Sequence, residues 1–332
     1  MKLTFETFQI FDNIVWKRFY EMKYILLFIL TLLLSSECFA RQADSFEEVQ
    51  YPYEVQRTIL PNGSTVAYTD QGDGEQTLLL IHGLGSYLPA WTRNIDEFSS
   101  RYRVIALDLP GYGKSSKNAE NHTIPFFAET VIQLLDELAI AQTAVAGHSM
   151  GGQIALYLAA HSPDRVEKLI LTAPAGFEQF SEQDRMAFRT MVSAEGIAGT
   201  AEPMIRQNMG ANFYRFPPEA EFMIEDRIKM KDLPDFDEYA RAQAESIFAM
   251  LDEPVADLLA DIQQPTLIVF GNQDALIPNP FLHPDLTVES VAKSGSDMLP
   301  NATLKFIDEA GHFVHFEQAP EFNQMVMEFL GE

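Results

Sequence analysis

The sequence predicts an α/β fold, in which a mostly parallel, doubly wound sheet carries helices on both faces and an inserted helical cap. From about residue 51 the chain alternates short apolar, β-branched runs with longer helical patterns, as parallel sheets flanked by helices do. Between about Phe177 and Leu259, five or so amphipathic stretches follow one another without a strand pattern. The 332 residues are 47% hydrophobic and 11% aromatic, which indicates a packed core.

The strands and helices of the core follow from these patterns in chain order. Strands are expected where short β-branched runs end at turn residues; they are Ser64–Thr69, Thr77–Ile81, Arg103–Leu107, Thr143–Ala146, Lys168–Thr172, Thr266–Phe270 and Thr303–Ile307. Helices are expected where apolar residues recur every three or four positions; they are Trp91–Ser99, Pro125–Leu138, Met150–His161 and Glu321–Leu330.

The domain prediction places the core in residues 41–176 and 260–332, and the cap in residues 177–259. The cap holds seven of the thirteen methionines and many aromatic residues. Flexible apolar side chains of this kind suit the wall of an adaptable ligand cavity. They can equally form the core of the cap itself.

The N-terminus has the layout of a secretory signal. Lys23 precedes the apolar run Tyr24–Leu34, and the segment Ser35–Ala40 follows it and ends in alanine. The run of eleven is shorter than the roughly 20 residues that span a bilayer. We therefore expect residues 1–40 to be a cleaved signal peptide and the protein to be periplasmic or secreted; an uncleaved membrane anchor is the alternative. Met22 is a possible true start.

The chain contains one cysteine, Cys38, which lies within the expected signal. A lipoprotein reading through Cys38 is weaker, because Glu37 stands where such signals carry a small residue. A mature chain from Arg41 would have neither a disulfide framework nor a thiolate metal site. Its stability would therefore come from packing.

The charge balance limits the partners. The formal net charge is −25, from 23 Lys and Arg against 48 Asp and Glu. Nucleic acids and anionic membranes bind Lys and Arg patches, so neither is an expected partner, and no stable membrane contact is expected beyond the N-terminal segment.

One serine stands at a turn between a strand pattern and a helix pattern. Residues Gly147–Gly151 read G-H-S-M-G, which matches G-x-S-x-G in a strand-turn-helix context. In such a turn, Ser149 adopts a strained backbone, and small neighbours at Gly147 and Gly151 let the strand and helix pack closely. Ser149 is therefore the candidate nucleophile, and the alternative is a purely structural turn.

A serine hydroxyl needs a base, which is usually a histidine held by a carboxylate. Asp274 follows a predicted strand, where a loop can present its carboxylate, although it could instead form an Asx turn. Two histidines follow the next strand, and we favour His312, after a glycine in a loop, over His315. The candidate triad is therefore Ser149, Asp274 and His312.

The oxyanion formed in acyl transfer needs backbone N–H donors. Met150, the residue after the nucleophile, is one. The second is expected in the loop after the strand Thr77–Ile81, and we assign it to Leu84, between two glycines that allow its amide to turn inward. His82 in the same loop is expected to brace the loop rather than act as a base.

Together these segments resemble the α/β-hydrolase superfamily, specifically the cap-bearing group of esterases, lipases, C–C bond hydrolases and cofactor-free haloperoxidases. The resemblance extends over about residues 53–331 and includes Asp108–Ser115, which looks like the D-x-P-G-x-G-x-S turn of the family. It implies this fold and a serine nucleophile; Ser149 argues against the haloalkane dehalogenases and epoxide hydrolases, which carry aspartate there. The sequence departs from the family in extra residues around Pro278–Asp297.

Other chemistries find little support. Gly83-Leu84-Gly85 lacks the third glycine of a dinucleotide fingerprint, and Asp108 replaces the first glycine of a phosphate loop before Gly113. The seven histidines include no His-x-x-x-His pair of zinc type with a nearby glutamate. No cofactor and no metal are expected.

The sequence therefore predicts a serine hydrolase that cleaves a small to medium, apolar carboxylic ester through an acyl-enzyme. A C–C bond hydrolase of the meta-cleavage type and a cofactor-free haloperoxidase or perhydrolase are the enzyme alternatives. A catalytically silent binding protein on the same fold is the alternative of another class.

Overall fold

A computed structural model describes residues 46–331, and the predicted signal segment lies outside these residues. Eight strands form one sheet in the order β1-β2-β4-β3-β5-β6-β7-β8. β1 and β2 pair antiparallel, as do β2 and β4, and all other pairs are parallel. The strands are β1 (Gln56–Ile59), β2 (Thr65–Gln71), β3 (Thr77–Ile81), β4 (Arg103–Leu107), β5 (Thr143–His148), β6 (Val166–Thr172), β7 (Thr266–Gly271) and β8 (Ala302–Ile307).

Helices lie on both faces of this sheet because the buried strands are apolar on both sides. Leu78 and Leu80 of β3 pack in one apolar cluster with Phe98 of helix α2 and Phe322 of helix α12. Leu79, between them, points the other way and packs with helices α3, α4 and α10. The core helices are α2 (Thr92–Ser99), α3 (Ile124–Glu137), α4 (Met150–His161), α10 (Val288–Ser296), α11 (Val314–Glu317) and α12 (Ala319–Gly331).

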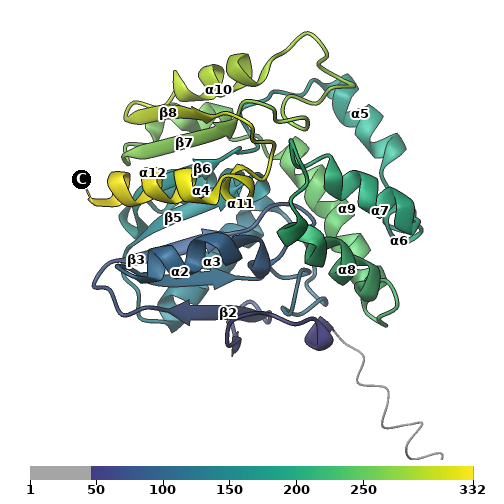
Figure 1. Ribbon diagram of the computed structural model, residues 1–332, viewed down its shortest axis with the longest axis horizontal. Coiled ribbons are helices and arrows are strands. Elements are labelled where there is room, and N and C mark those ends of the chain that lie inside the picture. The colour runs from purple at the N-terminus through teal and green to yellow at the C-terminus, as the bar shows by residue number, and fades with distance from the viewer. Residues whose placement is uncertain (1–45, 332) are drawn as a thin grey trace, which may run out of the picture. The chain divides into compact units, whose positions relative to one another are not determined.

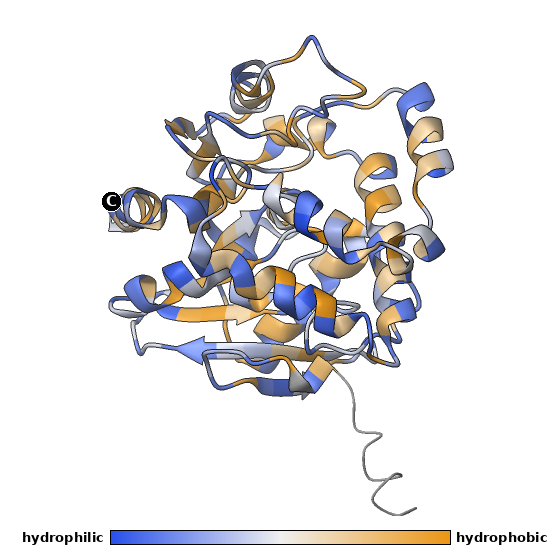
Figure 2. Ribbon diagram, turned by 45° about the vertical axis from the view of Figure 1, so that its right-hand side comes forward, coloured by the Kyte–Doolittle hydropathy of each residue, from blue (hydrophilic) through white to orange (hydrophobic). Residues whose placement is uncertain are grey.

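Five α-helices and no strand lie between β6 and β7, and they gather beside one end of the sheet (Figure 1). Hydrophobic residues appear on these helices as well as in the sheet (Figure 2). The helices are α5 (Glu182–Met191), α6 (Ala194–Ala198), α7 (Glu202–Gly210), α8 (Glu221–Met230) and α9 (Phe236–Asp252). We call residues 177–259 the cap. The predicted fold class, a mostly parallel α/β sheet with an inserted helical cap, is confirmed.

Short 3-10 helices complete the secondary structure: η1 (Phe46–Glu48), η2 (Leu88–Trp91), η3 (Pro163–Arg165), η4 (Pro218–Ala220) and η5 (Ala256–Asp261). Within residues 46–331, none of the helices combines the length and the apolar character that a bilayer crossing needs.

The extra residues 278–297 form a loop followed by helix α10. The side chain of Thr287 accepts a hydrogen bond from the Ser290 amide, and the Ser290 side chain accepts one from the Thr287 amide, so a capping box starts the helix. The loop before it is tied to the cap, because Glu178 accepts hydrogen bonds from the Asn279 amide at 2.8 Å and from the His283 ring. The segment therefore closes over the edge of the cap.

Candidate active site

Ser149 sits in a sharp turn between β5 and α4 with φ 52° and ψ −116°. This is the strained backbone that the motif predicts, since a non-glycine residue rarely adopts positive φ. Both backbone groups of Ser149 are anchored: its amide donates to Thr172 O at 3.0 Å, and its carbonyl accepts from the Ala175 amide at 3.0 Å. β6 and the loop after it therefore hold the turn in place.

Glycines make this turn possible. A Cβ at Gly147 would lie 2.2 Å from the carbonyl oxygen of Gly151, and a Cβ at Gly151 would lie 2.4 Å from the carbonyl oxygen of Ile81. No side chain fits at such distances, so only glycine lets α4 approach β5 and β3 this closely. The hydroxyl of Ser149 is thereby placed at the N-terminus of α4, where the helix dipole favours developing negative charge.

Asp274 and His312 are brought together in the loops after β7 and β8. Nδ1 of His312 lies 2.8 Å from Oδ2 of Asp274, and both side chains are buried. Oδ1 of Asp274 accepts from the amides of Leu276 at 2.8 Å and Ile277 at 3.1 Å. Asp274 therefore makes the local turn with one oxygen and holds the imidazole with the other.

The two loops are joined to each other as well. The Gln273 amide donates to Ala310 O at 2.9 Å, and the Ala310 amide donates to the side-chain oxygen of Gln273 at 3.2 Å. The acid and the imidazole are therefore positioned by one connected piece of backbone.

His312 and Ser149 line the same cavity. With Nδ1 of His312 donating to Asp274, Nε2 carries the lone pair, and no hydrogen bond within residues 46–331 occupies it. His315 does not line this cavity: its fully buried ring packs against those of Trp91, at 4.3 Å, and His148, at 4.6 Å, and burial lowers its pKa to about 3. Of the two histidines, the structure brings His312 to the serine and the acid.

His148, the variable residue of the G-x-S-x-G motif, adds a contact that sequence reasoning missed. Its Nε2 donates to the carbonyl oxygen of His312 at 3.1 Å, and the two rings lie 4.8 Å apart. Burial, with His315 and His312 nearby, lowers the pKa of His148 well below its usual value. His148 therefore remains a neutral donor that fixes the backbone of His312.

We call residues 83–87 the oxyanion loop. Gly83 O accepts from Nδ1 of His82 at 2.8 Å and from the Ser86 amide at 3.2 Å, while Nε2 of His82 accepts from the Leu109 amide at 3.0 Å. In a trans peptide the C=O and the next N–H point in opposite directions, so these bonds fix where the Leu84 amide points. His82 thus braces the loop, as expected.

Both expected oxyanion donors are free to act. The Leu84 amide has no acceptor among the hydrogen bonds of residues 46–331, and Met150, as the first residue of α4, has no intrahelical acceptor. A Cβ at Gly83 would lie 3.1 Å from Cβ of Ser149, so the loop passes directly beside the serine.

A cavity of about 330 Å³ opens at Ser149 and His312, and we call it the serine cavity. Core loops supply one side of it, and the cap supplies the other. Apolar side chains dominate its wall; they include Phe180, Phe188, Ile247, Met250, Leu276 and Ile277. Ser149 and His312 therefore face a cavity whose wall is largely apolar.

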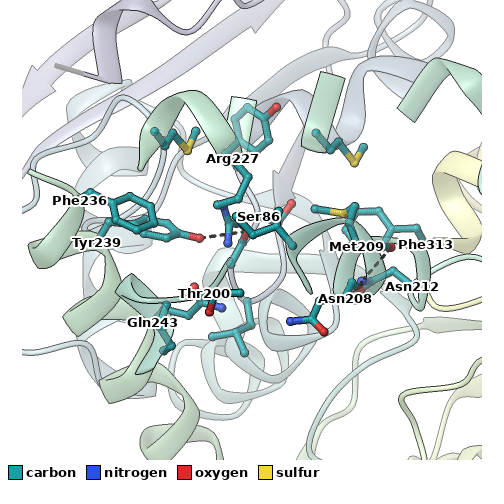
Figure 3. A pocket seen from close by; sticks show the side chains of 18 residues that line it. Ser86, Thr200, Asn208, Met209, Asn212, Arg227, Phe236, Tyr239, Gln243 and Phe313 are labelled. Atoms are coloured by element: carbon teal, nitrogen blue, oxygen red, sulfur yellow. Dashed lines mark hydrogen bonds between the residues drawn. The ribbon is translucent and has the colours of Figure 1, made fainter. Parts of the chain in front are cut away.

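A second, more polar cavity of about 200 Å³ adjoins the first beneath the cap, and we call it the arginine pocket (Figure 3). The two cavities share Leu84, Asn212 and Phe313. Arg227 of α8 and Gln243 of α9 reach into it, and the Arg227 Nε and the Gln243 side-chain oxygen have no hydrogen-bond partner in the described chain. A bound molecule could therefore place an apolar part and a polar part on opposite sides of Leu84.

Candidate metal ligands do not cluster in the described residues. Across the part of the chain that the structure describes, His, Cys, Asp and Glu side chains form no group of three or more that could hold a metal ion.

Comparison with known proteins places this geometry in a wider group. The model of the family described as alpha/beta hydrolase fold matches residues 76–319. A dihydrolipoyllysine-residue acetyltransferase component of the acetoin cleaving system from Pseudomonas putida is 36% identical over 261 residues, or 78% of this chain. The alignment spans 64% of the length of that protein.

Two further similarities concern hydrolases. A 2-hydroxy-6-oxononadienedioate/2-hydroxy-6-oxononatrienedioate hydrolase from Burkholderia vietnamiensis is 30% identical over 280 residues, covering 80% of this chain and 90% of that one. The crystal structure of a membrane phospholipase A has a TM-score of 0.68 and 25% identity, covering 97% of this chain and 98% of that one.

Proposed function

This chain belongs to the α/β hydrolase fold family, and from this premise we propose that it is a serine hydrolase of carboxylic esters with an apolar part. Ser149 is the nucleophile, His312 the base and Asp274 the group that orients the base. The 2.8 Å contact between His312 Nδ1 and Asp274 Oδ2, beside a serine in a strained turn, is the observation that carries the proposal.

Catalysis follows from these positions. Oγ of Ser149 attacks the ester carbonyl and gives its proton to Nε2 of His312, while the Leu84 and Met150 amides bind the oxyanion. The C–O bond then breaks, and the leaving alcohol takes the proton from His312, which leaves an acyl-enzyme. Water, deprotonated by His312, attacks the acyl carbonyl, and the acid leaves as Ser149 regains its proton.

The apolar wall of the serine cavity favours an aliphatic or aromatic acyl group. The similarity to a membrane phospholipase A supports an ester with a long apolar chain as one substrate class. The arginine pocket then receives the polar part of the ester.

A Ser149→Ala variant assayed on chromogenic esters of increasing chain length tests the proposal. We expect turnover to fall by a factor of at least about 10³. A serine-directed phosphonate should label wild type stoichiometrically at Ser149 and leave the variant unlabelled. Wild-type turnover in Ser149→Ala would contradict the mechanism, and a folded wild-type protein that no phosphonate labels would indicate a silent binding protein.

Carbon–carbon bond hydrolysis of a vinylogous diketone is the second candidate. The polar lining of the arginine pocket and the 30% identity to a hydrolase of such compounds favour it. A panel that contains both esters and meta-cleavage products separates the two: kcat/KM at least about tenfold higher for the diketones would select the second candidate.

We also propose that the protein is exported, or anchored through its N-terminal segment. The apolar run Tyr24–Leu34 supports this proposal. Fractionation of cells that express the full chain, with N-terminal sequencing of the product, tests it. A mature end at Arg41 in the periplasm indicates cleavage, an intact chain in the membrane fraction indicates an anchor, and an intact chain in the cytoplasm would contradict both.

A further inference from the structure

The oxyanion loop is held from two sides, and only one of them is the core. On the core side, His82 fixes the Gly83 carbonyl, and Oδ1 of Asp108 accepts from the Leu88 amide at 2.6 Å just beyond the loop. The opposite side of the loop faces the cap. There, three side chains of helices α8 and α9 hydrogen-bond to residues of the loop.

Two cap side chains bind the same carbonyl oxygen. Arg227 of α8 donates through its guanidinium to Gly85 O, and the hydroxyl of Tyr239 of α9 donates to the same oxygen at 3.3 Å. The guanidinium also lies over the Tyr239 ring, 4.8 Å from its centroid, so the two donors support each other. Gly85 is the residue directly after Leu84. Because both donors lie on cap helices, the orientation of the Gly85 carbonyl is tied to the cap.

Packing at Gly85 is as close as the hydrogen bonding. Gly85 has φ +62°, and a Cβ there would lie 2.8 Å from the amide nitrogen of the Gln243 side chain. The cap thus packs directly against the residue after the expected oxyanion donor, and the positive φ of Gly85 disfavours any side chain there.

A second contact fixes the far end of the loop. The Tyr87 hydroxyl donates to Oδ2 of Asp226 at 2.6 Å, and both side chains are buried. Asp226 does not line the arginine pocket or the serine cavity. Its role in this region is therefore to hold Tyr87 rather than to contact a substrate.

We propose that the cap completes the support of the oxyanion hole: Asp226, Arg227 and Tyr239 are positioning residues that hold Tyr87 and the Gly85 carbonyl, and they thereby keep the Leu84 amide, whose direction the Gly83 carbonyl sets, in place beside Ser149. This inference rests on the proposed function. Core contacts hold Gly83 and Leu88 at the two ends of the segment, and cap contacts hold Gly85 and Tyr87 between them, so we expect the loop to loosen around Leu84 when the cap contacts are removed.

Substitutions at the two hydroxyl contacts test the proposal, because Asp226 lies outside both cavities and phenylalanine preserves the rings of the tyrosines. We expect Asp226→Leu, Tyr87→Phe and Tyr239→Phe each to lower kcat about tenfold. Asp226→Leu, which alters neither cavity, should change KM by less than about twofold. Asp226→Asn keeps an oxygen acceptor for Tyr87 and should retain most of the turnover. Arg206→Gln is the matched control, since Arg206 pairs with Glu202 and Glu221 on the outer surface of the cap, and it should leave kcat unchanged.

The rate of phosphonate labelling at Ser149 distinguishes a positioning role from a merely structural one. Its tetrahedral adduct needs the oxyanion donors, so we expect the labelling rate of Asp226→Leu and Tyr239→Phe to fall in parallel with kcat, while thermal unfolding shows a folded protein. Wild-type labelling rates in both variants would overturn the inference. A kcat loss in Asp226→Asn as large as that in Asp226→Leu would also overturn it. Failure of wild type to label at Ser149 would instead overturn the proposed function.

Discussion

The ring of His148 packs against that of His312, and its Nε2 donates to the His312 carbonyl oxygen at 3.1 Å. His312, the proposed base, is thus held from two directions, by Asp274 at its ring and by His148 at its backbone. We expect His148→Phe to lower kcat by about threefold to tenfold, the effect of losing one neutral hydrogen bond. His148→Gln can donate to the same carbonyl and should recover part of the loss. Steady-state kinetics checks both; equal losses in the two variants would contradict a hydrogen-bonding role.

The two histidines after β8 should differ sharply in function. His312→Gln removes the proposed base, and we expect kcat to fall by at least about 10³-fold. His315→Phe keeps an aromatic ring against Trp91 and should change kcat by less than about threefold. Assays of both variants on one chromogenic ester decide between them, and the reverse result would assign the base to His315.

Gly83 should tolerate no side chain. A Cβ there would lie 2.8 Å from Nδ1 of the buried His148 ring and 3.1 Å from Cβ of Ser149. Gly83→Ala must therefore displace the oxyanion loop, and we expect kcat to fall by about 10²-fold. Gly210→Ala in the cap is the matched control, because nothing lies within 4 Å of the added methyl group. Full activity in Gly83→Ala would show that the Leu84 amide is not an oxyanion donor.

Stability should fall in acid because His315 is buried in its neutral form. Its pKa is about 3 in the folded protein against the usual histidine value of about 6.5, so between these values the unfolded chain binds a proton that the folded chain does not. The contribution of neutral His315 to the free energy of unfolding is fully present above about pH 6.5. It is lost as the pH falls toward 3, by about 1.4 kcal/mol per pH unit. Urea unfolding of wild type and His315→Phe at pH 7, 6 and 5 measures this slope. Unfolding of the variant should take up one proton fewer, so its free energy of unfolding should change less with pH. An unchanged slope would exclude His315 as the source of the pH dependence.

The serine cavity should set the chain-length preference. Ile247 of α9 lines it, so Ile247→Phe fills part of the space and Ile247→Ala enlarges it. We expect Ile247→Phe to lower kcat/KM for long-chain esters by about tenfold while short-chain esters react normally, and Ile247→Ala to shift the preference toward longer chains. If kcat/KM changed by the same factor for all chain lengths in both variants, the acyl group would bind outside the serine cavity.

Much of the fold could be predicted because its strands are buried runs with clear ends. Strands β3 and β4 and helix α4 occupy the predicted residues. Strand β1 was missed, since Gln56–Ile59 lies at the edge of the sheet and is mostly exposed, without an apolar run to mark it. Helix α10 was also missed, although the capping box between Thr287 and Ser290 marks its start in the sequence.

The same distinction applies to the candidate site, where some residues carry a local sequence signal and others do not. Ser149, Asp274 and His312 follow strands and carry a motif or a chain order, so the sequence could indicate them. Asp226, Arg227 and Tyr239 lie on cap helices whose packing no local pattern specifies, and their contacts with the oxyanion loop reach across about 140 residues or more. Such contacts follow from the angle at which the cap meets the core, which single-sequence periodicity does not encode.

The paired hydrogen bonds between Gln273 and Ala310 have a consequence for how this scaffold can change. They hold the loops of Asp274 and His312 in one frame, so we expect a substitution at Phe188 of α5 or Ile247 of α9 to reshape the serine cavity without moving the contact between His312 and Asp274. A library confined to the cap side chains that line the serine cavity, with Tyr239 left unchanged, should therefore yield altered selectivity while turnover is retained.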